Sequence, residues 1–471
     1  MPRLASPRLA AILLLVAACR TTVPPTPSPH ALVLAHATVI DTTGGPSIRD
    51  VVVVVEGNRV KAVEPAGRAT LPKHARVVDA TGKYVIPGLW DMHTHLFSHV
   101  DRPGTNRSAW AFPLYVANGV TGVRDLWTDP DDIATARRWN ELRAQGTLLA
   151  PHLEWSSRIV DGDPPHIKGA AVVTTPDQAR QLVEELKAGG AGFIKTYWNL
   201  RREVFFAIAE QAKKSGIPFA GHVPSSVSAF EASDAGMKSI EHLTGIEETC
   251  STRSDEFQRI PPEKWTPNLG DLVARRAFET FDEKRCADLF ARFARNGTWQ
   301  VPTLLLLQSL GLAQEAGIAS SPALEYVPTF VREKWPVRDG AGRPLALRRA
   351  RFARLLRFVG DLHRAGVGIL AGSDFGNPLM VAGFSLHDEL ALLTEAGLTP
   401  LQALQTATRN VGVYFGRNDI GTINQGSVAD LVILDADPVV DIRNTRRIAG
   451  VVLGGRYVDR QELQALLDGL R

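Results

Sequence analysis

Strand-like and helix-like segments alternate along residues 87–415, and this alternation restricts the fold more than any other feature. The expected helices, such as 175–190 and 202–216, carry an acidic residue early and end at glycine. Eight strands are expected, at 84–96, 120–127, 152–160, 192–198, 218–224, 239–245, 299–307 and 368–376. The pattern predicts an α/β fold, a (β/α)8 TIM barrel over 87–415, with insertions at 246–298 and 308–367.

Both ends of the globular part have β-like patterns. Residues 31–86 and 416–460 contain short apolar runs separated by Gly, Asp and Thr. Neither segment can bury a face of its own strands. We therefore expect one composite β-sandwich domain, built from 31–86 and 416–471 together.

The charge balance gives no indication of a nucleic-acid partner. Its 471 residues contain 53 Lys and Arg against 50 Asp and Glu, a net charge of +3. No block of like charge stands out, so the expected partner is a small molecule or short peptide. The oligomeric state is left open.

The first thirty residues resemble an export signal. Arg3 and Arg8 precede the apolar run Leu9 to Ala18, and "VAAC" ends at Cys19. The run is shorter than the roughly 20 residues that span a bilayer. "VAAC" resembles the lipobox of bacterial lipoproteins, which implies a signal peptide at 1–18, an acylated Cys19 and a disordered linker through residue 30. The expected location is the cell envelope, membrane-anchored and facing the periplasm; a plain secretory signal and a core helix are the alternatives.

Two further cysteines, Cys250 and Cys286, follow. An oxidising envelope would permit a disulfide, but spacing alone does not show proximity. We interpret them as two buried thiols and leave the disulfide open.

Six polar side chains fall at or near the carboxyl ends of the expected strands, where barrel enzymes build their active sites. Each has a structural alternative: a core histidine, a lysine paired with Glu241, or a helix N-cap. Their shared position instead predicts a metal site. The six residues are His93, His95, Lys195, His222, His242 and Asp374.

Lys195 requires a separate argument, because an ammonium ion cannot ligate a metal. Burial lowers the pKa of a lysine, and the neutral amine can capture carbon dioxide as a carbamate. A carbamate has two oxygens that can bridge two cations. We therefore expect two divalent ions, zinc by preference, sharing a hydroxide.

The motifs "PGLWDMHTH", "FIKTYW", "GHV", "IEH", "AGSDFG" and "GSVADLVILDADP" together resemble the amidohydrolase superfamily, in its imidazolonepropionase- and prolidase-like branch. The resemblance covers residues 31–460. It implies hydrolysis of a carbon–nitrogen bond by a metal-bridging hydroxide. It also implies that His93 and His95 hold the more buried metal with Asp374, and that His222 and His242 hold the other. Carbamylated Lys195 would bridge them, and Asp374 would transfer the proton.

The substrate is less constrained. The loop "GHVPSS" differs from the "HAxG" that relatives often carry. The prolidase-like resemblance suggests a dipeptide or N-acyl amino acid, with Tyr197 and Arg158 as candidate substrate-binding residues. A lactonase or phosphotriesterase-like hydrolase and a non-catalytic binding lipoprotein are the alternatives. No role is assigned to His99, His166, His363 or His387, which are interpreted as surface or loop residues.

Overall fold

A sheet of eight strands joins the two ends of the globular chain, in a computed structural model that describes residues 31–97, 107–335 and 344–470. Its order is β17-β16-β15-β5-β1-β2-β3, and β4 pairs with β1. Strands β5 and β15 form the antiparallel junction between the two ends, with Val85 opposite Ile433. The strands are β1 (Leu32–Val39), β2 (Ile48–Glu56), β3 (Arg59–Pro65), β4 (Arg76–Asp79), β5 (Tyr84–Pro87), β15 (Leu431–Leu434), β16 (Ile448–Leu453) and β17 (Arg456–Asp459).

The pairing of the two ends has a simple physical cause. Alternate residues of β1, such as Leu32 and Leu34, lie against Val53 and Leu431 in one buried cluster. Since side chains alternate between the faces of a strand, each end supplies apolar residues that only the other can cover. The division of the chain into domains stays a prediction.

The central part contains two parallel sheets. One has the order β6-β7-β8 and the other the order β10-β9-β11-β12-β13-β14. These strands are β6 (Leu89–Thr94), β7 (Val120–Asp125), β8 (His152–Trp155), β9 (Ile159–Asp161), β10 (Ala171–Val172), β11 (Ile194–Thr196), β12 (Phe219–Gly221), β13 (Ser239–Glu241) and β14 (Trp299–Val301).

The segment 368–376, expected as the eighth strand, is not a regular strand. It contacts both sheets through isolated parallel bridges, Gln300 to Ile369 and Thr94 to Phe375. The hydrogen-bond ladders do not close into a ring, so the observed class is α/β and the closed barrel stays a prediction.

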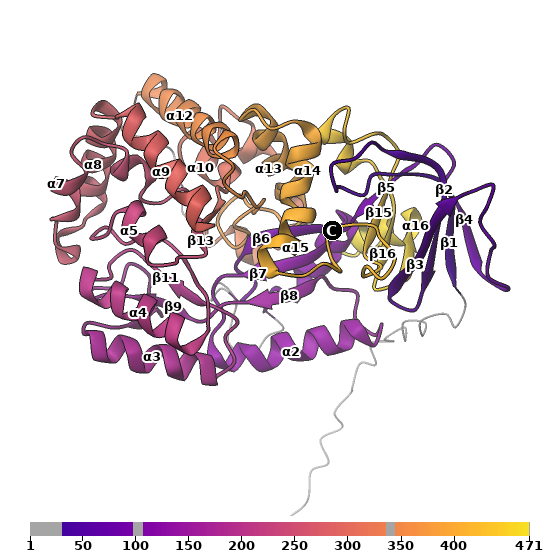
Figure 1. The fold of residues 1–471 in the computed structure, drawn as a ribbon, viewed down its shortest axis with the longest axis horizontal. Helices are drawn as coiled ribbons and strands as arrows, with labels where there is room; N and C mark the ends of the chain where they lie inside the picture. The colour runs from indigo at the N-terminus through magenta and orange to yellow at the C-terminus, as the bar shows by residue number, and fades with distance from the viewer. Residues whose placement is uncertain (1–30, 98–106, 336–343, 471) are drawn as a thin grey trace, which may run out of the picture.

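Helices cover the central sheets (Figure 1). Helix α3 shows why they form: Thr175 and Gln178 make a capping box, and Ala179, Val183 and Leu186 form the buried stripe. The α-helices are α1 (Phe112–Ala117), α2 (Pro130–Ala144), α3 (Pro176–Ala188), α4 (Arg202–Ser215), α5 (Ala229–Asp234), α6 (Ile246–Thr249), α7 (Ser254–Gln258), α8 (Pro267–Glu279), α9 (Glu283–Asn296), α10 (Leu304–Leu312), α11 (Thr329–Arg332), α12 (Leu345–Arg364), α13 (Phe384–Glu395), α14 (Pro400–Thr406), α15 (Arg409–Phe415) and α16 (Arg460–Asp468).

Short 3-10 helices complete the described structure: η1 (Arg107–Ala111), η2 (Pro262–Lys264), η3 (Ile318–Ser320), η4 (Pro322–Tyr326) and η5 (Ile442–Arg446). In the described ranges no helix combines the length and the apolar character needed to cross a membrane. The export signal proposed for residues 1–30 lies outside these ranges.

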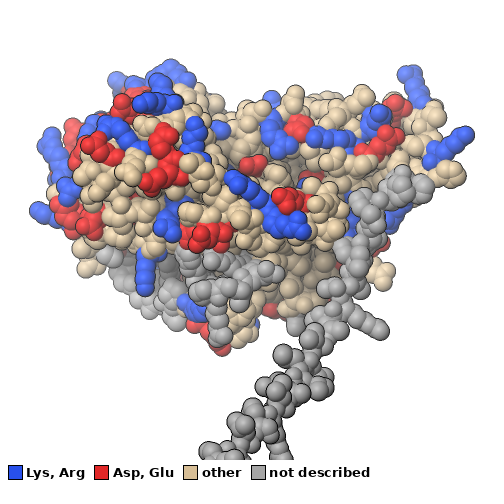
Figure 2. All heavy atoms as spheres, turned by 90° about the horizontal axis from the view of Figure 1, so that it is seen from below, with Lys and Arg blue, Asp and Glu red and all other residues tan. Residues whose placement is uncertain are grey.

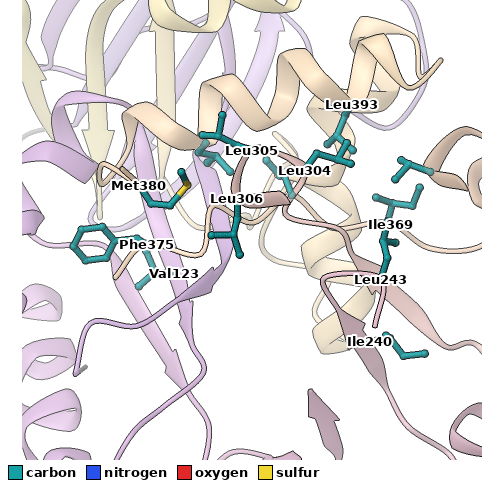
Figure 3. Close-up of a cluster of buried hydrophobic side chains, with 14 of the residues drawn as sticks. Val123, Ile240, Leu243, Leu304, Leu305, Leu306, Ile369, Phe375, Met380 and Leu393 are labelled. Carbon is teal, nitrogen blue, oxygen red and sulfur yellow. The ribbon is translucent and has the colours of Figure 1, made fainter. Parts of the chain in front are cut away.

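Apolar side chains from strands and helices meet in a continuous core. Figure 3 shows part of this core, with Leu304 and Leu393 from the helices on one side of Ile369 and Ile240 of β13 on the other. The run 304–307, expected to extend the seventh strand, instead begins helix α10. On the face seen in Figure 2, acidic and basic side chains are interspersed, as the balanced composition suggests.

The interpretation of Cys250 and Cys286 as separate thiols is wrong for this structure. The two residues form a disulfide with a Cα–Cα distance of 4.7 Å, and both are buried. The bond ties the end of α6 to α9 within the expected insertion 246–298. Sequence spacing could not reveal it, because the contact depends on how α6 and α9 pack.

Candidate metal centre

His93 and His95 lie on one face at the end of β6. Residues two apart on a strand point the same way, so both imidazoles reach the same space. The Oδ1 oxygen of Asp374 lies 3.3 Å from the Nε2 nitrogen of His93 and 3.0 Å from that of His95. A ligand atom from each of the three residues lies within 4.8 Å of the others. This spacing suits ligands of one cation.

Asp374 reaches the histidines because its segment passes close to β6. Its backbone N–H donates to the carbonyl oxygen of His93 at 2.8 Å. A Cβ at Gly372 would lie only 2.8 Å from the Cβ of His93, so glycine permits this approach. Asp374 itself has a φ of 59°, a strained conformation of a kind often found at functional sites.

His242 and His222 adjoin this group. The Nε2 nitrogen of His242 lies 3.8 Å from the Oδ2 oxygen of Asp374, and its Nδ1 nitrogen is 2.7 Å from the Thr303 hydroxyl. The ring centroids of His93 and His242 are 4.5 Å apart, and those of His222 and His242 are 5.0 Å apart. Four imidazoles from β6 and from the ends of β12 and β13 therefore converge.

Lys195 lies in the middle of β11 with 1% of its surface exposed. Burial lowers the pKa of its ammonium group to about 8, although Glu241 and Asp374 act to raise it. Its charge in turn acts on the pKa of His93, His222 and Asp374, so it belongs to the same cluster.

The protonation states suit metal binding. Burial holds the pKa of His93 and His222 well below the ordinary value, and lowers that of His242 to about 4. Burial raises the pKa of Asp374, but His242, His95 and Lys195 lower it more, so the carboxyl pKa is below normal. Near neutral pH these groups are neutral imidazoles and a carboxylate, the forms that coordinate metals.

Several buried polar atoms of this cluster also lack a hydrogen-bond partner within the described part of the chain. Buried polar atoms are normally hydrogen-bonded, so a cluster of exceptions indicates a missing ligand. The atoms are His93 Nε2, His95 Nδ1, Lys195 Nζ, His222 Nδ1 and Asp374 Oδ1. Nitrogen and carboxylate donors are the ligands that zinc takes, so these residues fit a divalent metal centre.

A cavity of about 650 Å³ opens over the cluster. His95, His222, His242 and Asp374 contribute to its wall, together with the aromatic residues Trp127, Tyr197 and Trp198. A mostly apolar cavity with a few convergent polar groups is typical of a small-molecule site.

The two candidate substrate residues lie in different environments. Tyr197 lines the cavity and stacks on His222, with ring centroids 4.2 Å apart. Arg158 instead donates from Nε to Asp129 at 2.8 Å and is not among the residues lining this cavity. The cavity wall contains Arg351, which the sequence did not single out and which pairs with Glu247 at 3.0 Å.

The unassigned histidines agree only in part with expectation, since His166 is an exposed loop residue, as expected. His166 lines the cavity. His387 is 1% exposed within α13 and contacts the Thr445 hydroxyl and the Asn118 carbonyl, so its interpretation as a surface residue is wrong. His363 lies partly buried on α12, and His99 falls outside the described residues.

Comparisons with known proteins support one family. A profile described as the Amidohydrolase family matches residues 347–458. The chain is 24% identical over 410 residues to adenine deaminase 2 of Agrobacterium fabrum, covering 86% of this chain and 53% of that protein. It is 26% identical over 403 residues to imidazolonepropionase of Salinispora tropica, covering 82% and 86%. The chain thus spans about half the length of the adenine deaminase.

Solved structures give the same result. Bottromycin amidohydrolase superposes with a TM-score of 0.72 at 28% identity, covering 94% of this chain and 91% of that one. A prolidase complexed with N-methylphosphonate-L-proline superposes with a TM-score of 0.67 at 20% identity, covering 92% and 100%. At 20% identity, the similarity to this prolidase shows a shared fold only. The predicted resemblance is confirmed.

Proposed function

We propose that the chain is a metal-dependent amidohydrolase of a small substrate, because the proteins that it resembles are hydrolases of carbon–nitrogen bonds. The observation that carries this proposal is the convergence of four imidazoles, Asp374 and buried Lys195 beneath one cavity. Several of their nitrogen and oxygen atoms have no hydrogen-bond partner, whereas buried polar groups with a purely structural role are normally hydrogen-bonded.

We propose two divalent ions, with zinc preferred by the donor set. His93, His95 and Asp374 would hold one ion, and His222 and His242 the other. Such ions would supply an activated water and a polarised substrate carbonyl. The Nζ nitrogen of Lys195 would add to carbon dioxide and release a proton, forming the bridging carbamate. Its burial and its pKa of about 8 support this step, since a fraction of the amine is neutral near pH 7.

Asp374 is proposed to move the proton. Its lowered pKa keeps it ionised, so it can accept the proton of the attacking water. It borders the cavity, and hence can deliver that proton to the leaving nitrogen.

The proposed substrate is a dipeptide or N-acyl amino acid. The prolidase-like motifs of the sequence and the aromatic wall of Tyr197, Trp198 and Trp127 support this class. Arg158 pairs with Asp129 and does not line the cavity. Arg351 also has an acidic partner, Glu247, but it lies in the cavity wall and is therefore the better candidate to meet a substrate carboxylate.

A closed (β/α)8 barrel and export are also proposed. The bridges of Ile369 and Phe375 to the two sheets support a barrel. The lipobox-like sequence at Cys19 supports a cell-envelope lipoprotein, and the Cys250–Cys286 disulfide suits an oxidising compartment.

The test is a hydrolysis screen of the zinc-loaded protein against dipeptides, N-acyl amino acids, lactams, lactones and phosphotriesters. Turnover of amides that disappears with a chelator and returns with zinc is expected. Turnover of phosphotriesters or lactones alone would replace the carbon–nitrogen assignment. Equal rates on free and amidated dipeptides would remove carboxylate recognition only.

A further inference from the structure

Arg124 of β7 is the largest fully buried side chain among the described residues, with 0% exposure. Its guanidinium donates from Nε to the Met92 carbonyl at 2.7 Å and from Nη1 to the Tyr414 hydroxyl at 2.7 Å and the Ser239 hydroxyl at 3.1 Å. Nη2 donates to both carboxylate oxygens of Glu241 at 2.9 Å. Such complete satisfaction of a buried cation fixes its position.

Glu241 in turn contacts and orients a predicted metal ligand, His93. Its Oε2 oxygen lies 2.8 Å from the Nδ1 nitrogen of His93. An ionised carboxylate only accepts hydrogen bonds, so Nδ1 must carry the imidazole proton. The lone pair is then on Nε2, the unpartnered atom that faces Asp374.

The charge of the pair also matters. A lone buried carboxylate is costly, and it would add negative charge beside the centre. Burial lowers the pKa of Arg124, but Glu241 and Tyr414 raise it more, so the guanidinium remains charged and compensates Glu241. Glu241 can therefore accept from His93 without adding net charge.

The pair also joins two ligand-bearing strands. Met92 directly precedes His93 on β6, and Glu241 directly precedes His242 at the end of β13. Arg124 contacts both, and thereby holds the two strands that bring the His93 and His242 rings to 4.5 Å.

We propose that Arg124 and Glu241 are a positioning pair for the metal centre: Glu241 fixes the tautomer and orientation of His93, and Arg124 holds and neutralises Glu241. This inference rests on the proposed metal-dependent function. Neither residue touches the cavity; each acts through His93.

The test measures zinc affinity of the full chain by chelator competition, and the visible spectrum of the cobalt-substituted protein. Outer carboxylate partners of metal-bound histidines typically change affinity about 10- to 100-fold. Glu241→Gln keeps the shape and is expected to weaken zinc binding by that range and to shift the cobalt bands. Arg124→Met is expected to do the same. The double variant should bind zinc no more weakly than either single variant, since the two residues act as a unit.

Arg143→Met is the matched control, because it breaks a partly buried ion pair with Asp430, and neither residue of that pair lines the cavity. It is expected to lower the melting temperature but not the zinc affinity or the cobalt spectrum. If Arg124→Met does not fold, Tyr414→Phe removes one contact of Arg124 and should give a smaller shift in the same direction.

Wild-type affinity and an unchanged cobalt spectrum in Glu241→Gln would overturn the positioning role and leave the proposed function intact. A wild-type chain that binds neither zinc nor cobalt would overturn both.

Discussion

The carboxylate of Asp374 lies 3.0 Å from the imidazole of His95, and the two residues come from opposite ends of the central region. The same carboxylate lies 3.3 Å from His93 and 3.8 Å from His242. One side chain thus contacts both halves of the candidate centre, which is why its removal should affect chemistry more than folding.

Asp374→Asn keeps the size of the side chain but removes its basicity. General acid–base groups contribute about 10²- to 10⁴-fold, so kcat is expected to fall by at least that range. Some loss of metal is also expected. Steady-state kinetics with zinc quantified by elemental analysis separates the two effects. Asp388→Asn, which removes a carboxylate paired with Arg446, is the control. Near-normal turnover would show that a group other than Asp374 transfers the proton.

Lys195→Ala is expected to lose the pair of metals, because the proposed bridging anion cannot form. Elemental analysis should give about two ions per wild-type chain and fewer in the variant. The wild-type protein in ¹³C-bicarbonate should show a carbamate resonance that the variant lacks. Lys187→Ala, which changes an exposed lysine of α3, should behave as wild type. A full metal complement in Lys195→Ala would exclude the carbamate.

Buried His387 should make folding sensitive to acid. Burial lowers its pKa from the ordinary 6.5 to about 3 in the folded protein. Between these values the unfolded chain binds the proton and the folded one does not. The stabilisation is therefore present above pH 6.5 and lost as pH falls toward 3, by up to about 1.4 kcal/mol per pH unit.

Urea unfolding between pH 7 and pH 4 measures this effect. His387→Gln is expected to reduce the pH dependence of the unfolding free energy relative to wild type. His363→Gln on α12 should retain it. An unchanged pH dependence in His387→Gln would show that other groups cause the acid sensitivity.

Removing the disulfide with Cys286→Ala should lower the unfolding free energy by about 2–4 kcal/mol, since the bond closes a loop with a sequence separation of 36. Denaturant unfolding with and without a reductant is the measurement. Reductant should destabilise the wild type and leave the variant unchanged. Equal stability of wild type and variant in oxidising buffer would argue against a bonded pair in solution.

Cys19 is expected to be acylated in a bacterial host. Radiolabelled palmitate should mark the wild-type chain, and Cys19→Ser should lose the label, because one residue carries the predicted modification. Stable attachment to a membrane needs more than one acyl chain. If Cys19 carries several chains, as expected of a lipoprotein, fractionation should recover the labelled protein with the membranes. Label that persists in Cys19→Ser would contradict the assignment.

Much of the candidate centre is predictable from local patterns. His93 and His95 share a strand face because of their spacing, and Lys195 stands out within the apolar strand "FIKTYW". His222, His242 and Asp374 follow apolar runs, and the carboxyl ends of parallel strands meet at one edge. These inferences need only the period of a strand and its direction.

The remaining features depend on contacts that no local pattern encodes. The Arg124–Glu241–His93 chain, the Arg158–Asp129 pair and the Cys250–Cys286 bond all join segments remote in sequence. The run 304–307 is apolar enough for a buried strand or a buried helix. In the folded chain it forms the start of helix α10, because of how it packs. Sequence alone therefore determined which residue types meet at the strand ends. Only the tertiary structure decided their partners, because a side chain's partner depends on the packing of the whole chain.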